Sequence, residues 1–156
     1  MDLRETLKRF NIKPKKSLGQ NFLFDEAILD RIVAAAEVGP GDVVLEIGPG
    51  AGSLTRHLAQ AAARVLAVEL DDRLIPVLRH TLAGFPNVTI IHGDILKVQI
   101  PNLKSQTPNS NYKVVANIPY YLTSALIRRL LEAEAKPSLV VLTVQREVAG
   151  RICASP

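Results

Sequence analysis

The tetrapeptide Asn117-Ile118-Pro119-Tyr120 has residue types suited to holding an aromatic amine. The Asn117 amide oxygen and a nearby backbone carbonyl could accept both N–H bonds of an exocyclic amine such as that of adenine. Those contacts would turn the nitrogen lone pair toward an incoming methyl group and stabilise the positive charge that develops on nitrogen. Pro119 would hold the turn, and Tyr120 could stack on a flipped base, a contact worth roughly 1–3 kcal/mol. The same residues also fit an Asx-type turn that carries a proline and an exposed tyrosine.

A glycine-rich segment at residues 46–52, EIGPGAG, indicates a binding loop for a nucleotide-type ligand. Gly48 and Gly50 would supply the positive φ angles and the close backbone approach that such a loop needs. Glu69 ends the next apolar run, where a carboxylate can accept hydrogen bonds from both ribose hydroxyls. Taken singly, these features also fit an ordinary glycine turn and a Glu at a helix start. Together they favour the ligand site.

Asp94 and Ile95 follow a third apolar run, in the segment HGDI. Asp94 could accept a hydrogen bond from an adenine amino group while Ile95 packs on the ring. Asp94 could also cap a helix, and both roles can hold at once. These features leave NAD and S-adenosylmethionine open as ligands. Because a pyrophosphate favours a free helix N-terminus, the short loop with Pro49 better suits a ligand that has no phosphate.

Alternating strands and helices must position these residues. Apolar runs predict strands at residues 43–47, 65–68, 88–91, 113–116 and 139–144, with helices at residues 53–62, 71–83 and 122–135 and a loop at residues 104–111. Before them, we expect a short helix at residues 1–9, an irregular segment at 10–24, and a helix capped by Asp25 that runs to about Val38 and ends before Pro40-Gly41. This alternation predicts an α/β fold, a mostly parallel sheet with helices on both faces. Because a bare apolar edge strand is prone to aggregate, we expect the sheet to be incomplete at its C-terminal edge and the natural chain to continue.

Positive charge is concentrated near the N-terminus. Residues 1–16 carry six basic and two acidic side chains, whereas the charges of the remaining residues balance. A lysine-rich arm favours nucleic-acid phosphates through counterion release, although a solvated basic tail would have the same composition.

Other classes of protein are disfavoured by composition. The single cysteine, Cys153, excludes a disulfide framework, and no Cys/His spacing predicts a metal site. The N-terminus lacks the apolar core of a signal peptide, and no stretch approaches the roughly 18 apolar residues of a membrane span. We therefore expect a soluble, cytoplasmic protein with no membrane contact.

With these motifs in view, the sequence resembles the ribosomal RNA adenine dimethyltransferases, in particular the bacterial enzymes that dimethylate two adjacent adenines near the 3′ end of small-subunit RNA. The motifs that carry the resemblance are residues 19–23 (GQNFL), 46–55, 68–71 (VELD), 93–94, 117–121 and 145–149 (QREVA). The resemblance implies a Rossmann-like class I methyltransferase fold and S-adenosylmethionine as the methyl donor. It also implies direct in-line transfer, with alignment and electrostatics supplying most of the rate.

The resemblance further implies roles for single residues. Those expected to hold the cofactor are Asn21 and Leu23, which would close over it, Gly48 and Gly50 in the loop, Glu69 at the ribose, Asp94 and Ile95 at the adenine, and Asn117 beside it. Asn117, Pro119 and Tyr120 would serve the target base. Residues 1–24 would form a basic arm that covers the cofactor, and residues 25–156 the catalytic domain. The expected partner is ribosomal RNA in a small-subunit precursor, bound by a monomer during ribosome biogenesis.

The sequence departs from the family pattern at its C-terminal end. Family members continue with two further strands, an additional aromatic stacking residue and a small helical domain, and none of these follows Pro156. The fragment itself could therefore be inactive.

Three other interpretations remain. The antibiotic-resistance enzymes that methylate a large-subunit adenine more often have Ser and Lys where this chain has Pro49 and Ala51. A methyltransferase-like mitochondrial transcription factor is disfavoured by the short distance to the first motif and the lack of a transit peptide. An NAD-dependent oxidoreductase is disfavoured by the turn at Asn117.

Overall fold

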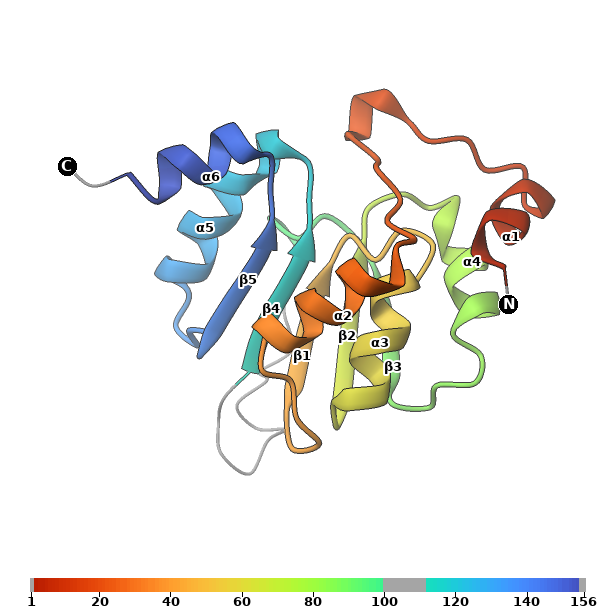
Figure 1. Ribbon diagram of the computed structural model, residues 1–156, viewed down its shortest axis with the longest axis horizontal. Coiled ribbons are helices and arrows are strands. Elements are labelled where there is room, and N and C mark those ends of the chain that lie inside the picture. The colour runs from red at the N-terminus through yellow and green to blue at the C-terminus, as the bar shows by residue number, and fades with distance from the viewer. Residues whose placement is uncertain (1, 100–111, 155–156) are drawn as a thin grey trace.

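The computed structural model describes residues 2–99 and 112–154, which form a five-stranded sheet with helices packed around it (Figure 1). The elements in chain order are α1 (Leu3–Arg9), η1 (Lys16–Leu18), α2 (Glu26–Ala35), β1 (Val43–Ile47), α3 (Ser53–Ala61), β2 (Arg64–Glu69), α4 (Leu74–Thr81), β3 (Val88–His92), β4 (Tyr112–Asn117), η3 (Tyr120–Leu122), α5 (Thr123–Glu132), β5 (Leu139–Thr143) and α6 (Arg146–Ile152). All five predicted strands are present, and their bounds agree with the prediction to within one residue. The predicted α/β fold is confirmed.

The sheet has the order β3-β2-β1-β4-β5, and every neighbouring pair runs parallel. β1 is central, with Ile47 aligned to Val68 of β2 and to Ala116 of β4. The chain moves outward from β1 to β2 and β3, and then returns to the opposite side of β1 as β4. Because the winding reverses between β1 and β4, the loops there diverge and leave a crevice at the carboxyl ends of the strands, as in Rossmann-like folds.

Helices cover both faces of the sheet because successive strand residues point to opposite sides. On one face, Val44 and Val65 are fully buried in a core shared with α2 and α3. On the other face, Leu45 and Val114 are fully buried in a core that includes Leu126 of α5. Burial on both faces explains why the central strands read as continuous apolar runs.

The N-terminal arm is folded onto the domain beside α4 (Figure 1). The Asp2 side chain caps α1 by accepting hydrogen bonds from the N–H groups of Arg4 and Glu5. Leu7 is buried against Leu74 of α4. The basic side chains of α1 remain exposed. The short helix expected at residues 1–9 is therefore present, and it is packed rather than free.

Several helix bounds differ from the prediction. Asp25 caps α2 as expected, accepting from the Ile28 N–H at 3.1 Å, but the helix ends at Ala35 instead of Val38. The chain turns at Glu37, whose φ is 47°, with Glu37 and Val38 donating back to Ala34 and Val33 as in a Schellman cap. Because a glutamate and not a glycine occupies the left-handed position, the sequence does not mark this helix end.

Three further elements differ as well. α5 ends at Glu132 rather than at residue 135. α4 begins at Leu74 rather than at residue 71, because Asp71 and Asp72 form a turn that precedes the helix. α6 was not predicted. The loop expected at residues 104–111 lies outside the described residues.

β3 and β5 form the two edges of the sheet. In the C-terminal elements, Val140 of β5, Leu131 of α5 and Ile152 of α6 are exposed apolar side chains. Within the described part of the chain, no helix is long and apolar enough to cross a membrane.

Candidate active site at the carboxyl ends of the strands

A cavity lies at the carboxyl ends of β1, β2, β3 and β4, and residues 18–23 of the N-terminal arm form one of its walls. The predicted site residues that line it are Asn21, Leu23, Gly48, Gly50, Glu69, Asp94, Ile95, Asn117 and Pro119. These residues come from five separate parts of the chain. The structure therefore brings together all the predicted site residues except Tyr120.

The glycine loop after β1 adopts the backbone conformation that its sequence predicts. Gly48, Gly50 and Gly52 have φ angles of 71°, 61° and 89°, in the region that disfavours side chains. A Cβ on Gly50 would lie 3.1 Å from the Phe22 ring, so the arm packs directly on the loop. At Gly48 the nearest such contact is the Asn117 carbonyl at 3.7 Å. The loop thus places bare backbone between the arm and the end of β4.

Glu69 ends β2 and is 5% exposed, which rules out the alternative of a solvent-exposed Glu at a helix start. Its Oε2 accepts from the Gly50 N–H at 3.1 Å, and its Oε1 accepts from the Asp71 N–H at 2.9 Å. Burial raises the pKa of Glu69, while these backbone donors oppose the rise. Each carboxylate oxygen retains a second lone pair, so the group can also accept from a ligand hydroxyl.

Asp94 begins a turn rather than a helix. Its Oδ1 accepts from the Leu96 N–H at 2.9 Å, and its carbonyl accepts from the N–H groups of Lys97 and Val98. Ile95 is 4% exposed and belongs to the core beneath the cavity. The helix-capping role considered for Asp94 is therefore wrong, because only a turn follows it. The bond within this turn uses one carboxylate oxygen and leaves the other free to accept from a ligand.

Asn117 is the last residue of β4 and lies beside the glycine loop. Its Nδ2 donates to the Asn21 carbonyl at 3.4 Å, which turns the amide nitrogen toward the arm. Pro119 packs against the arm as well, since a Cβ on Gly19 would lie 2.6 Å from the Pro119 Cβ. The turn after β4 is thus held by residues almost 100 positions earlier in the chain.

The two tyrosines after Pro119 occupy different positions. Tyr120 is 62% exposed and does not line the cavity, whereas Tyr121 is 52% exposed and does. Their rings meet edge to face, with centroids 6.3 Å apart. Tyr121 was not among the predicted site residues, and nothing in the sequence distinguished it from its neighbour.

The sequence matches the ribosomal RNA adenine dimethylase family over residues 11–156. The chain belongs to this family. It is 46% identical over 154 residues to the ribosomal RNA small subunit methyltransferase A of Alkaliphilus oremlandii, covering 98% of this chain and 54% of that protein. The chain spans about half the length of the curated relatives it matches.

Solved structures of similar proteins share the fold. A dimethyladenosine transferase from Plasmodium falciparum superposes with a TM-score of 0.75 and 33% identity, over 86% of this chain and 47% of that one. The 23S rRNA methyltransferase ErmE superposes with a TM-score of 0.72 and 38% identity, over 83% of this chain and 50% of that one. Proteins named for the small ribosomal subunit and a protein named for 23S rRNA are thus both among those similar to this chain.

This member of the adenine dimethylase family has a further buried acid that sequence reasoning did not assign. Glu46 lines the cavity, is 1% exposed, and its Oε2 has no hydrogen-bond partner among residues 2–99 and 112–154. Burial raises the pKa of the Glu46 carboxyl to about 8; the Thr55 hydroxyl opposes the rise, and the negative charge of Glu69 adds to it. An acidic residue inside an otherwise apolar strand was the available signal.

Proposed function

We propose that the protein transfers methyl groups from S-adenosylmethionine to the N6 amino groups of adenines in small-subunit ribosomal RNA. The expected product carries two methyl groups on each of two adjacent adenines, formed during ribosome biogenesis. The observation that carries this proposal is the meeting of Asn117, Glu69 and the glycine loop in one cavity. The residues proposed to bind the cofactor and the residue proposed to bind the target amine therefore line the same cavity.

The charge of the cavity supports S-adenosylmethionine over NAD. Its lining contains the acids Glu46, Glu69 and Asp94, and no Lys, Arg or His among the residues that the structure describes. A pyrophosphate would meet the acidic side chains of Glu69 and Asp94 there and no basic one, whereas the positively charged sulfonium and ammonium groups of the methyl donor complement those acids. The residues present therefore fit the donor.

The predicted cofactor residues would have distinct roles toward that donor. Glu69 would accept from the ribose hydroxyls, Asp94 from the adenine amino group, and Ile95 would pack on the adenine. Gly48 and Gly50 leave room for the methionine part, and residues 21–23 cover the ligand. When bound, the donor supplies an electrophilic methyl group on sulfur.

Asn117 is placed to orient the target amine. Because its Nδ2 donates to the Asn21 carbonyl, its Oδ1 is left to accept an N–H bond from the exocyclic amine. A second bond could go to a carbonyl of the turn that Pro119 holds. Accepting both protons directs the nitrogen lone pair away from the ring and stabilises the charge that develops on nitrogen. Tyr120 would hold the flipped base from outside the cavity, with Tyr121 nearer to it.

The small subunit is favoured as the source of the RNA by the relatives named above. The proteins that are about 46% identical carry the small-subunit name, whereas ErmE, named for 23S rRNA, is 38% identical. We propose further that residues 1–24 serve as a basic RNA-facing arm that covers the cofactor, and that residues 25–156 form the catalytic domain. The protein would act as a cytoplasmic monomer.

The test is methyl transfer by the complete natural protein from labelled S-adenosylmethionine to immature small subunits, compared with naked large-subunit RNA. We expect Asn117→Ala to abolish transfer while S-adenosylhomocysteine binding, measured by calorimetry, stays within about twofold. Thr143→Ala is a matched control, because Thr143 pairs with Asn117 on the neighbouring strand and does not line the cavity. Full activity of the Asn117 variant, or preference for naked large-subunit RNA, would contradict the proposal.

A further inference from the structure

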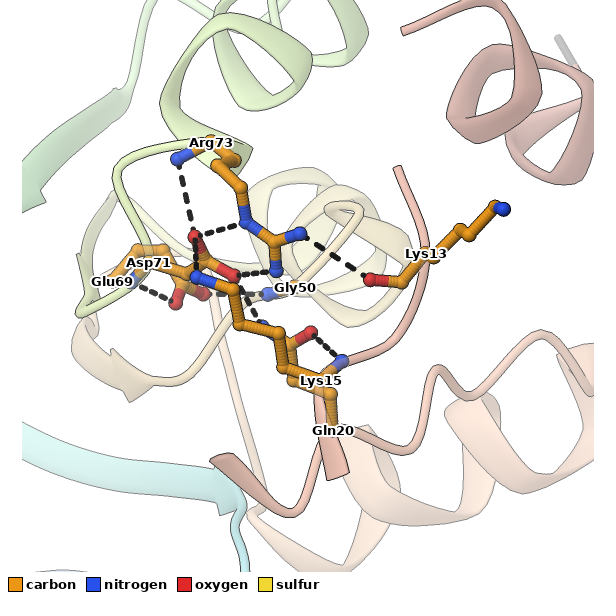
Figure 2. A network of polar contacts seen from close by, with 7 residues as sticks. All are labelled: Lys13, Lys15, Gln20, Gly50, Glu69, Asp71 and Arg73. Carbon is orange, nitrogen blue, oxygen red and sulfur yellow. Dashed lines mark hydrogen bonds and ion pairs between the residues drawn. The ribbon is translucent and has the colours of Figure 1, made fainter. Parts of the chain in front are cut away.

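Asp71 is the centre of a network that joins the N-terminal arm to the end of β2, as Figure 2 shows. Its side chain is 1% exposed and accepts from the Arg73 Nε at 2.9 Å and the Arg73 Nη2 at 2.5 Å. Its Oδ2 also accepts from the Gln20 Nε2 at 2.7 Å. The Lys15 Nζ lies 4.0 Å from its Oδ1. One buried carboxylate thus contacts the arm at two residues.

Gln20 extends this network along the arm. Its Oε1 accepts from the Lys15 N–H at 2.8 Å, which closes the turn formed by residues 15–20. Arg73 reaches the arm as well, donating from Nη1 to the Lys13 carbonyl at 3.5 Å. Both ends of the Gln20 side-chain amide are therefore used: the oxygen within the arm and the nitrogen against Asp71.

The opposite side of the same segment is fastened to the turn after β4. Gly19 packs on Pro119, and the Asn21 carbonyl accepts from Asn117. Residues 15–21 therefore span from the end of β2 to the end of β4, across the cavity that lies between them. We call this segment the strap. Its attachment at β4 consists of packing and one long hydrogen bond, whereas its attachment at β2 is a buried carboxylate with charged partners.

We propose that Asp71 is a positioning residue for methyl transfer: through Gln20 it holds the strap over the cofactor cavity. This inference rests on the proposed function, since it assigns the covered ligand to the methyl donor. Asp71 does not line the cavity, so it acts through Gln20, which does. The Asp71 backbone N–H, in turn, donates to Glu69 Oε1. The strap and the acid at the ribose position are thus fixed by one residue.

The charge of Asp71 makes this attachment strong. Hydrogen bonds from Arg73 lower the pKa of Asp71 to about 2, although burial opposes the shift. The carboxylate is therefore ionised at neutral pH, and charge-assisted hydrogen bonds are stronger than neutral ones. Asparagine would keep the shape and remove this charge.

The experiment compares three variants of the complete natural protein. Asp71→Asn removes the charge. Gln20→Met removes both hydrogen bonds of the Gln20 side chain and keeps a side chain of similar length. Asp72→Asn is the matched control, because Asp72 is exposed, adjacent, and lies outside the cavity. Amide hydrogen exchange of residues 15–20 without ligand reports the strap directly. Dissociation of S-adenosylhomocysteine, and kcat and KM for S-adenosylmethionine, report its effect on the site.

In Asp71→Asn we expect faster exchange confined to residues 15–20, and about tenfold faster ligand dissociation, the change that loss of one charged hydrogen bond produces. KM should rise by a similar factor with kcat nearly unchanged. Gln20→Met should act in the same direction. The double variant should lose less than the sum of the two single variants, because both remove the hydrogen bond between Gln20 and Asp71.

Exchange in the strap that matches the Asp72→Asn control would overturn the inference, as would additive effects in the double variant. If Asp71→Asn fails to fold, Gln20→Met alone decides, because Gln20 lies on the strap surface rather than in the core. A wild-type protein that binds no S-adenosylhomocysteine would refute the proposed function instead, and the ligand-free exchange would still decide whether Asp71 holds the strap.

Discussion

Replacing Glu46 with glutamine should change how the stability of the protein depends on pH. Glu46 is 1% exposed, and burial raises the pKa of its carboxyl from 4.5 to about 8. Between those values the folded protein retains a proton that the unfolded chain has lost. Stability contributed by the protonated group is therefore complete below pH 4.5, falls as the pH rises, and is lost once the pH reaches about 8. Glutamine resembles the protonated acid in shape and cannot ionise.

The magnitude follows from the slope within that window. One retained proton changes the free energy of unfolding by about 1.4 kcal/mol per pH unit, so the difference between Glu46→Gln and wild type should grow by about 2–3 kcal/mol from pH 5.5 to pH 7.5. Glu69 has a raised pKa and adds a slope of the same sign, but it is present in both proteins and cancels in the difference. The comparison therefore isolates Glu46.

Urea unfolding of both proteins at pH 5.5, 6.5 and 7.5, without ligand, measures this difference. We expect the glutamine variant to gain relative to wild type at each step. Glu132→Gln is a suitable control, because this substitution removes one carboxyl at an exposed position. Parallel pH profiles for wild type and Glu46→Gln would show that Glu46 is ionised in the folded protein, and that the reasoning from its burial is wrong.

Three other variants test the site. Glu69→Ala should weaken S-adenosylhomocysteine binding by about 1–3 kcal/mol in calorimetry, since a charged acceptor is lost; unchanged affinity would remove its role at the ribose. Gly50→Ala should lower the free energy of unfolding by about 1–2 kcal/mol, because φ is 61° and Phe22 is close; equal stability would mean that the loop relaxes freely. Arg129→Met removes two hydrogen bonds, of 2.8 and 2.6 Å, to the carbonyls of Leu96 and Val98. Faster amide exchange in residues 94–98 should follow, and unaltered exchange would argue against that support.

The fold was predictable because its signals are local. Apolar runs such as residues 43–47 are buried on both faces, so each strand can be predicted from its own residues without knowledge of its partners. The glycine loop was predictable for the same reason, since the positive φ values at Gly48 and Gly50 exclude most other residues. Strand order then placed the ends of β1 and β4 together, and with them the loop and Asn117.

The residues that the sequence did not reveal depend on distant contacts. Gln20 and Asp71 are 51 positions apart, and neither has a local pattern that points to the other. The end of α2 was missed because Glu37 adopts a left-handed conformation that is usual for glycine. Which of Tyr120 and Tyr121 faces the cavity depends on the short η3 turn, and period-based reasoning does not resolve one residue in such a turn.

The strap also separates charge. Lys15 and Lys16 are exposed on it and Lys13 is exposed just before it, whereas the lining of the cavity beneath includes the acids Glu69 and Asp94. A polyanionic RNA is attracted to the outer side and repelled by the inner one, and a cationic donor has the opposite preference. Asp71, on the boundary, is paired with Arg73 and contributes little net field. Two ligands of opposite charge can therefore approach from opposite sides of a single short segment. The phosphate backbone would stay outside while only a neutral base enters, which is the arrangement that transfer to a base nitrogen requires.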